Sequence, residues 1–194
     1  MEWENRQKYH HHSGFTTEGT YDPLLLFKMT DIKKNHTVLD AGSGTGYLSM
    51  IASRMIGDGG KVYSFDIHKD GIDILKMRIE HGGFNNIDAR VLDITEPLPV
   101  DDNEIDLAIF SNVLHGFIFN EEIDPVLKNI ERTVKPGGQV AIVEFLKEET
   151  EFGPPVDERF SPEEIEKVMK PAGLEMKDNS RISDNHYLAV FQKV

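Results

Sequence analysis

The feature that most constrains this chain is the segment TVLDAGSGTGY, residues 37–47. An apolar run ends in Asp40, and glycines follow at every second position, Gly42, Gly44 and Gly46. Glycine adopts positive φ angles without strain and lets another group approach the main chain closely. A strand that turns through glycines into a helix points backbone N–H groups above the carboxyl end of a sheet. The segment therefore predicts a strand, a ligand-binding turn and a helix; a tight turn without a ligand is the simpler alternative.

The rest of the chain alternates apolar strands with amphipathic helices. The apolar strands show little polar alternation, which indicates an α/β protein whose parallel sheet is covered by helices on both faces. A helix capped by Ser161 follows a polar loop, and the last two strands, joined by a turn at residues 183–185, form an antiparallel edge. The predicted strands are 37–41, 61–67, 89–93, 105–112 and 139–146. The helices predicted between them are 46–57, 69–83 and 125–134.

Three of the predicted strands end in an aspartate: Asp40, Asp66 and Asp93. Asp66 lies 20 residues after Gly46, where an acid accepts hydrogen bonds from ribose hydroxyls. Turn formation or helix capping is the ordinary alternative for any one of them. A carboxylate beside the glycine turn would repel a pyrophosphate, but it suits a ligand with a positive sulfonium and an amine.

The spacing of the glycines bears on which nucleotide would bind. A dinucleotide fingerprint requires G-x-G-x-x-G, whereas here the pattern is G-x-G-x-G and Tyr47 occupies the third dinucleotide position. An NAD-type oxidoreductase is therefore a weaker alternative. A non-catalytic protein that binds the cofactor and acts through a partner is a second alternative.

Five segments, VLDAGSGTGY, SFDI, VLDI, DLAIFSNVLH and VKPGGQVAIVEF, resemble the successive motifs of class I S-adenosylmethionine-dependent methyltransferases. The chain is similar to the methyltransferase type 11 and UbiE-like branch over about residues 15–194. The resemblance implies a Rossmann-like three-layer sandwich around a seven-stranded, mostly parallel sheet whose last strand is antiparallel. It also implies S-adenosyl-L-methionine as the cofactor and methyl transfer as the activity, and it leaves the acceptor open.

By this resemblance, the glycine turn with its acid would hold the methionine end of the cofactor. Asp66 would hold the ribose hydroxyls, Ile67 would pack on adenine, and Asp93 would accept from the adenine amino group. The residues that end the fourth strand would line the cavity. The implied cofactor-binding residues are Asp40, Gly42, Ser43, Gly44, Gly46, Asp66, Ile67, Asp93, Ile94, Ser111 and Asn112.

His115 and Glu144 are the candidate catalytic residues, because each follows or ends a strand at the predicted rim. A neutral imidazole at His115 can take a proton from a hydroxyl or amine acceptor. A loop histidine bonded to the backbone is the alternative. Glu144 would orient the substrate or stabilise charge. The aromatic residues expected around the pocket are Phe15, Tyr21, Phe117 and Phe119.

A run of three histidines, residues 10–12, precedes this machinery. Neighbours in an extended chain point to opposite faces, so the run would need a distant partner such as His115 to chelate a metal. No metal site is predicted, and the sequence leaves open whether the run binds metal or substrate.

Composition limits the partners. The net charge is -13, from 34 acidic and 21 basic residues, which disfavours a nucleic-acid substrate. A small molecule is the expected acceptor, and a large protein substrate that reaches the rim is the alternative. Cysteine is absent, which excludes disulfides and thiolate chemistry. Without an apolar run of about 18 residues or a signal sequence, we expect no membrane span and a cytoplasmic location. The 194 residues suit a single domain, a monomer or homodimer, with residues 1–35 as a lid.

Overall fold

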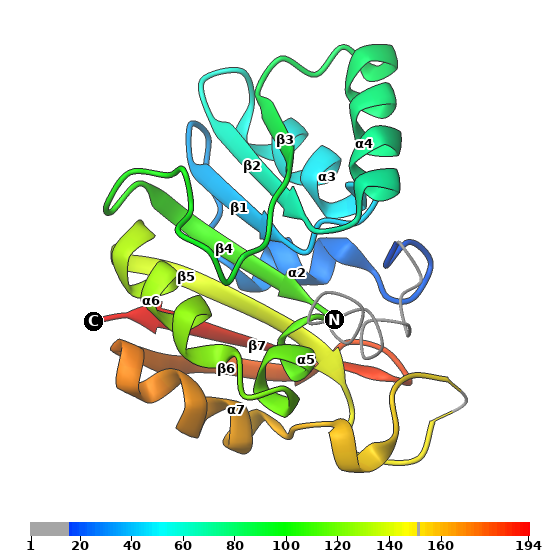
Figure 1. Ribbon diagram of the computed structural model, residues 1–194, viewed down its shortest axis with the longest axis vertical. Coiled ribbons are helices and arrows are strands. Elements are labelled where there is room, and N and C mark those ends of the chain that lie inside the picture. Colours follow the sequence, from blue (N-terminus) through cyan, green and yellow to red (C-terminus); the bar gives the residue numbers. More distant parts are fainter. Residues whose placement is uncertain (1–15, 151) are drawn as a thin grey trace, which may run out of the picture.

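A computed structural model describes residues 16–150 and 152–194 of the chain. Its centre is a seven-stranded sheet in the order β3-β2-β1-β4-β5-β7-β6 (Figure 1). The first five strands run parallel, and β7 runs antiparallel to both β5 and β6. This confirms the predicted fold class. The strands are β1 (Thr37–Ala41), β2 (Lys61–Asp66), β3 (Ile87–Val91), β4 (Ile105–Ser111), β5 (Val134–Phe145), β6 (Leu174–Arg181) and β7 (His186–Lys193).

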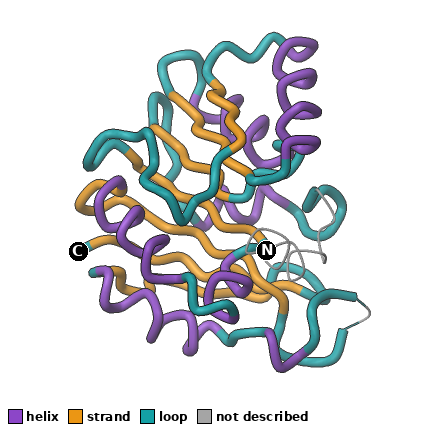
Figure 2. Tube along the Cα trace, in the orientation of Figure 1, coloured by secondary structure: helices purple, strands orange, loops and turns teal. Residues whose placement is uncertain are grey.

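Helices complete the three layers (Figure 2). α2 and α3 bury Leu26, Phe27 and Ile56 in the core on one face of the sheet. α5, α6 and α7 bury apolar residues such as Leu114 and Ile130 on the other face, and α4 packs along β2 and β3. The helices are α2 (Pro23–Met29), α3 (Tyr47–Ile56), α4 (Lys69–Gly82), α5 (Leu114–Phe119), α6 (Ile123–Thr133) and α7 (Pro162–Met169), with 3₁₀ turns at Val156–Glu158 and Lys170–Ala172.

The start of α7 agrees with the sequence prediction and adds to it. Ser161 Oγ accepts a hydrogen bond from the Glu164 N–H at 3.3 Å, and the Glu164 carboxylate accepts one from the Ser161 N–H at 2.8 Å. This reciprocal pair is a capping box, which satisfies two backbone donors that the first turn of the helix leaves free. It fixes where the chain re-enters the sheet after the loop that follows β5.

Two strands differ from the prediction by more than one residue at an end. β3 spans residues 87–91 rather than 89–93, so Asp93 lies beyond the strand, and β5 begins at Val134 and runs through the Pro136–Gly138 segment. None of the helices in residues 16–150 and 152–194 has the length and apolar character that crossing a bilayer requires.

Candidate active site

The glycine turn between β1 and α3 lies at the carboxyl edge of the sheet. Gly42, Gly44 and Gly46 have φ angles of 74°, 52° and 79°, in the left-handed region that favours glycine. The N–H groups of Gly42 and Ser43 both donate to the carbonyl oxygen of Phe65, at 2.8 and 3.1 Å. The turn is therefore tied to the end of β2.

Packing inside the protein also requires bare backbone in this turn. A Cβ on Gly42 would lie 2.6 Å from Val113 Cγ1, and one on Gly46 would lie 2.1 Å from Leu75 Cδ1. Both distances are far below van der Waals contact. The sequence predicts that these glycines make room for a ligand, whereas side chains that follow β4 and lie on α4 already require bare backbone at two of them.

Asp66 ends β2 and accepts hydrogen bonds from the main chain. Its Oδ2 accepts from the Gly44 N–H and its Oδ1 from the His68 N–H, both at 2.8 Å. A carboxylate offers about four acceptor positions, so these bonds leave capacity for further donors such as hydroxyls. Ile67, the next residue, is 38% exposed and presents apolar surface at the same rim.

Asp40 lies beneath α3 and is almost fully buried. It accepts a hydrogen bond from Ser49 Oγ at 2.5 Å, and Ser64 Oγ donates to Ser49 Oγ at 2.8 Å. Burial raises the pKa of Asp40 to about 6, the bond from Ser49 opposes this, and the charge of Asp66 adds to it. A cationic group placed nearby would favour the ionised carboxylate.

Asp93 forms a turn just beyond β3. Its Oδ1 accepts from the backbone N–H of Thr95 at 2.9 Å and from the Thr95 hydroxyl at 2.7 Å. The turn-forming alternative therefore describes what this oxygen does. Ile94 is buried in the core, and contact of these two residues with adenine stays a prediction.

Ser111 and Asn112 lie at the end of β4, as predicted. Ser111 Oγ shares a 2.8 Å hydrogen bond with the hydroxyl of Tyr21, whose pKa burial raises to about 12. Asn112 has a φ of 57° and donates its N–H to Val143 O at 2.8 Å. Asn112 Oδ1 and Ser43 Oγ are buried and find no hydrogen-bond partner among the described residues. Buried polar atoms in native structures are nearly always paired, so both fit polar groups of a ligand.

The structure brings the two candidate catalytic residues into direct contact. Glu144 Oε1 accepts from the His115 N–H at 3.1 Å, and Oε2 lies 2.8 Å from His115 Nδ1. An ionised carboxylate only accepts, so Nδ1 carries the proton and Nε2 of the neutral ring keeps its lone pair. Burial lowers the pKa of His115, but the charge and hydrogen bond of Glu144 outweigh it, and the pKa is raised above its usual value.

Two buried polar residues near this pair had no signal in the sequence beyond their residue types. Arg159 is 4% exposed and donates to the carbonyl oxygens of Pro154, Leu146 and Glu148, at 2.7 to 3.0 Å, which fixes the loop after β5. His186 begins β7 and is fully buried.

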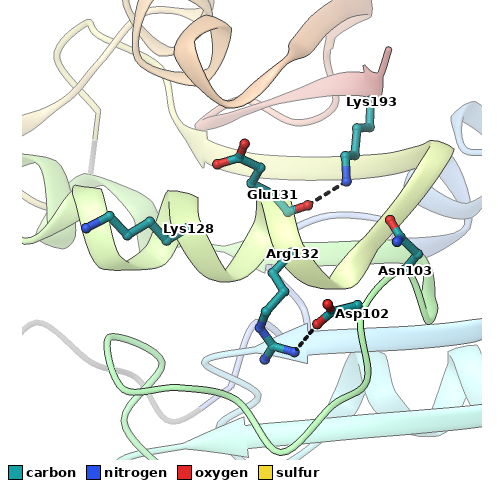
Figure 3. A pocket seen from close by; sticks show the side chains of 6 residues that line it. All are labelled: Asp102, Asn103, Lys128, Glu131, Arg132 and Lys193. Carbon is teal, nitrogen blue, oxygen red and sulfur yellow. Dashed lines mark hydrogen bonds and ion pairs between the residues drawn. The ribbon is translucent and has the colours of Figure 1, made fainter.

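A shallow depression of about 520 Å³ lies at the opposite, amino-terminal edge of the parallel strands (Figure 3). Two of its three cations are engaged by the protein itself: Arg132 pairs with Asp102 at 2.9 Å, and Lys193 Nζ donates to the carbonyl oxygens of Glu131 and Val134. The depression is therefore a solvated surface feature away from the glycine turn. It is lined by Asp102, Asn103, Lys128, Glu131, Arg132 and Lys193.

His10, His11, His12 and Phe15 lie outside the described residues. Tyr21 packs in the core on the face covered by α2 and α3, Phe117 packs from α5 against the core on the other face, and Phe119 is 45% exposed. Across residues 16–150 and 152–194, no three histidine, aspartate or glutamate side chains gather in an arrangement that could hold a metal ion.

The strand order, the glycine turn and an acid ending β2 together define a nucleotide-cofactor fold of the Rossmann-like kind. The chain matches the methyltransferase-domain family over residues 32–181 and belongs to that family. It is a class I S-adenosylmethionine-dependent methyltransferase, and S-adenosyl-L-methionine is the cofactor of this class.

Named relatives agree with this family. The ubiquinone/menaquinone biosynthesis C-methyltransferase UbiE of Pseudoalteromonas translucida is 32% identical over 122 residues, 62% of this chain and 47% of that protein. The chain thus spans about half the length of the curated relatives it matches. A SAM-dependent methyltransferase from Aquifex aeolicus superimposes with a TM-score of 0.80 at 26% identity, covering 90% of each chain. The [4+2]-cyclase SpnF, with a TM-score of 0.74 at 18% identity over 88% of this chain and 79% of its own, shares the fold alone.

Proposed function

We propose that this chain transfers the methyl group of S-adenosylmethionine to a small-molecule acceptor. The observation that carries the proposal is the His115–Glu144 pair, in which an acid orients a base. The pair lies at the carboxyl edge of the sheet, which also holds the glycine turn. The curated relatives are named as C-methyltransferases that act in quinone biosynthesis, which favours a small acceptor. A cyclase can share this fold, so the residues of the site, and not the fold, support the proposed reaction.

The described residues fit the cofactor. Asp66 would accept from the ribose hydroxyls while it holds the Gly44 N–H, and the exposed side chain of Ile67 would pack on adenine. Ser43 Oγ and Asn112 Oδ1 would gain the partners that the protein does not give them. When bound, S-adenosylmethionine supplies a methyl group on positive sulfur, which the buried carboxylate of Asp40 would favour electrostatically.

The chain's own contribution is alignment, exclusion of water and proton removal. Holding two reactants in line can contribute about 7 to 11 kcal/mol. His115 would take the acceptor's proton at Nε2, because Nδ1 is committed to Glu144, and Glu144 would stabilise the imidazolium that forms. A positioned base of this kind typically contributes about 10²- to 10⁴-fold in rate.

Three further points stay predictions. They are the single-domain division with residues 1–35 as a lid, the cytoplasmic location, and the monomeric or homodimeric state. Within the predicted lid, α2 buries Leu26 and Phe27 against the sheet.

Calorimetric titration with S-adenosylhomocysteine, with NAD as the control, tests the cofactor assignment. A radiolabelled methyl-transfer screen over phenols, hydroquinones, amines and thiols tests the reaction. His115→Gln should lower turnover by about 10²- to 10⁴-fold and leave S-adenosylhomocysteine affinity unchanged. A silent titration contradicts the cofactor proposal, and unchanged turnover in the variant contradicts the role of His115. Tight cofactor binding without transfer to any acceptor favours the non-catalytic alternative.

A further inference from the structure

We propose that His186, enclosed by the rings of Tyr21, Phe145 and Phe152, donates a hydrogen bond to an oxygen atom of a planar methyl acceptor. The inference names the substrate class for the proposed methyl transfer and therefore rests on that function. The expected ligand is a flat ring compound with a carbonyl or phenolate oxygen.

The enclosure forms where β5 ends and β7 begins. His186 pairs with Phe145 in the antiparallel ladder, and strand alternation turns both side chains away from Glu144, toward the face that holds Tyr21. The His186 ring centroid lies 4.3 Å from that of Phe145, 5.6 Å from that of Tyr21 and 6.4 Å from that of Phe152. Three aromatic rings therefore surround one imidazole.

The hydrogen bonds of Ser183 fix which ring nitrogen of His186 carries the proton. Ser183 Oγ accepts from the N–H of Asn185 at 3.2 Å and from the N–H of His186 at 3.1 Å. These bonds occupy both acceptor positions of the hydroxyl, so its O–H is left to donate to His186 Nδ1, 3.2 Å away. Nδ1 is therefore the acceptor, and the neutral ring carries its proton on Nε2.

That Nε2–H is a buried donor without an acceptor. The His186 side chain is fully buried, and Nε2 has no hydrogen-bond partner among the described residues. Burial lowers the pKa of His186 to about 4, so the ring is neutral at physiological pH and cannot relieve the deficit by charging. A buried polar atom left unpaired costs free energy, which a ligand oxygen would recover.

The enclosure borders the candidate active site. The charges of Glu144 and Arg159 act on the pKa of both His115 and His186. Tyr21 connects the enclosure to the cofactor edge, because its hydroxyl bonds Ser111 at the end of β4. The proposed base, His115, and the proposed hydrogen-bond donor to the methyl acceptor, His186, therefore lie in the same region.

Charge and exposure indicate what binds and how it enters. The Arg159 guanidinium lies 5.3 Å from the Phe145 ring centroid and favours an oxygen with partial negative charge, whereas the larger effect of the Glu144 charge on His186 opposes a full negative charge. Phe152 is 46% exposed whereas Tyr21, Phe145 and His186 are buried, so a ligand would reach Nε2 by displacing the Phe152 ring.

A matched pair of probes tests the hydrogen bond. 1-Tetralone and tetralin have the same fused ring skeleton, and only the former has a carbonyl oxygen. With S-adenosylhomocysteine present, we expect 1-tetralone to bind the full chain more tightly than tetralin. His186→Phe keeps the ring and removes the donor, so it should weaken 1-tetralone binding by roughly 3- to 10-fold and leave tetralin unchanged. His81→Phe, the same substitution at an exposed position on α4, should alter neither.

A second measurement does not depend on the variant. Nitrogen-15 spectra of histidine-labelled wild-type protein should show the His186 proton on Nε2 and a shift of that nitrogen on addition of 1-tetralone. Three outcomes would overturn the inference: equal 1-tetralone affinity in wild type and His186→Phe, no 1-tetralone binding, or a proton on Nδ1. If S-adenosylhomocysteine still binds and methyl transfer proceeds, these outcomes leave the proposed function standing. If the wild type neither binds S-adenosylhomocysteine nor transfers methyl, the proposed function fails and this inference fails with it.

Discussion

Gly46→Ala tests whether packing within the protein requires bare backbone in the glycine turn. Two costs add at this position. The φ angle of 79° places alanine in the left-handed region, which costs about 1 to 2 kcal/mol. The new Cβ would also lie 2.1 Å from Leu75 Cδ1 and 2.9 Å from Leu75 Cγ, and Leu75 is fully buried and cannot turn into solvent. Such overpacking typically costs about 1 to 3 kcal/mol, so we expect a total loss of roughly 2 to 5 kcal/mol in unfolding free energy.

Gly137→Ala is the matched control for this substitution. Gly137 has a φ of 77°, yet a Cβ there meets no atom within 4 Å, so the variant isolates the backbone cost of about 1 to 2 kcal/mol. Urea denaturation of both variants, with the slope checked for constancy, gives the two losses. Adding Leu75→Ala should cost less in the Gly46→Ala background than in the wild type, because it removes the overlap. If the two glycine variants lose equal stability, contact with Leu75 is not what excludes a side chain.

Three further substitutions test the carboxylates of the site. Asp66→Ala should weaken S-adenosylhomocysteine binding by about 1.5 to 3 kcal/mol in calorimetry, because ribose donors lose a charged acceptor; unchanged affinity would show that the assignment is wrong. The value of kcat/KM should rise with pH as His115 loses its proton. Glu144→Gln should move this rise to lower pH, because the carboxylate charge that raises the pKa of His115 is lost, and an unmoved profile contradicts the pairing. The pKa of Asp40 is raised to about 6 from 3.8, so the folded wild type binds more protons than the unfolded chain between about pH 4 and 6 and should lose about 3 kcal/mol across that window. The side chain in Asp40→Asn does not titrate. In urea unfolding at pH 4, 6 and 8, the unfolding free energy of the variant minus that of wild type should increase from pH 4 to pH 6 and stay constant above pH 6. A difference that is the same at all three pH values contradicts the shift.

Much of the fold follows from local sequence pattern, and its failures have local causes. The four strands at the centre of the parallel sheet are buried on both faces, so their apolar runs identify them. β3 lies at the edge with residues that are half-buried or exposed, so its alternation is weak and its predicted bounds were displaced by two residues. α2 and α5 have 7 and 6 residues, too few for a helical period to be read.

The site was predictable where topology alone places residues. Parallel strands bring their carboxyl ends to one edge, so Asp40, Asp66 and Asp93 were expected near one another. Asp40 and Asp66 lie at the ends of β1 and β2, whereas Asp93 forms a turn beyond β3. The bond between His115 and Glu144 depends on where α5 begins after β4, which is a tertiary property without a sequence signal. His186 was missed for the same reason, since its burial depends on rings contributed by distant segments.

The end of β5 shows how one strand terminus can serve two parts of the proposed reaction. Glu144 and Phe145 are neighbours, so strand alternation sends them to opposite faces of the sheet. Glu144 fixes His115 on the face covered by α5, and Phe145 packs on His186 on the face that holds Tyr21. Because the faces meet at the carboxyl edge, a flat acceptor held by its oxygen at His186 would lie beside the charge that also governs His115. A shift of β5 by one residue would exchange the faces to which Glu144 and Phe145 point and would break both the His115–Glu144 and the His186–Phe145 contacts. The register of β5 with β7 therefore determines where the proposed base lies relative to the hydrogen-bond donor for the methyl acceptor.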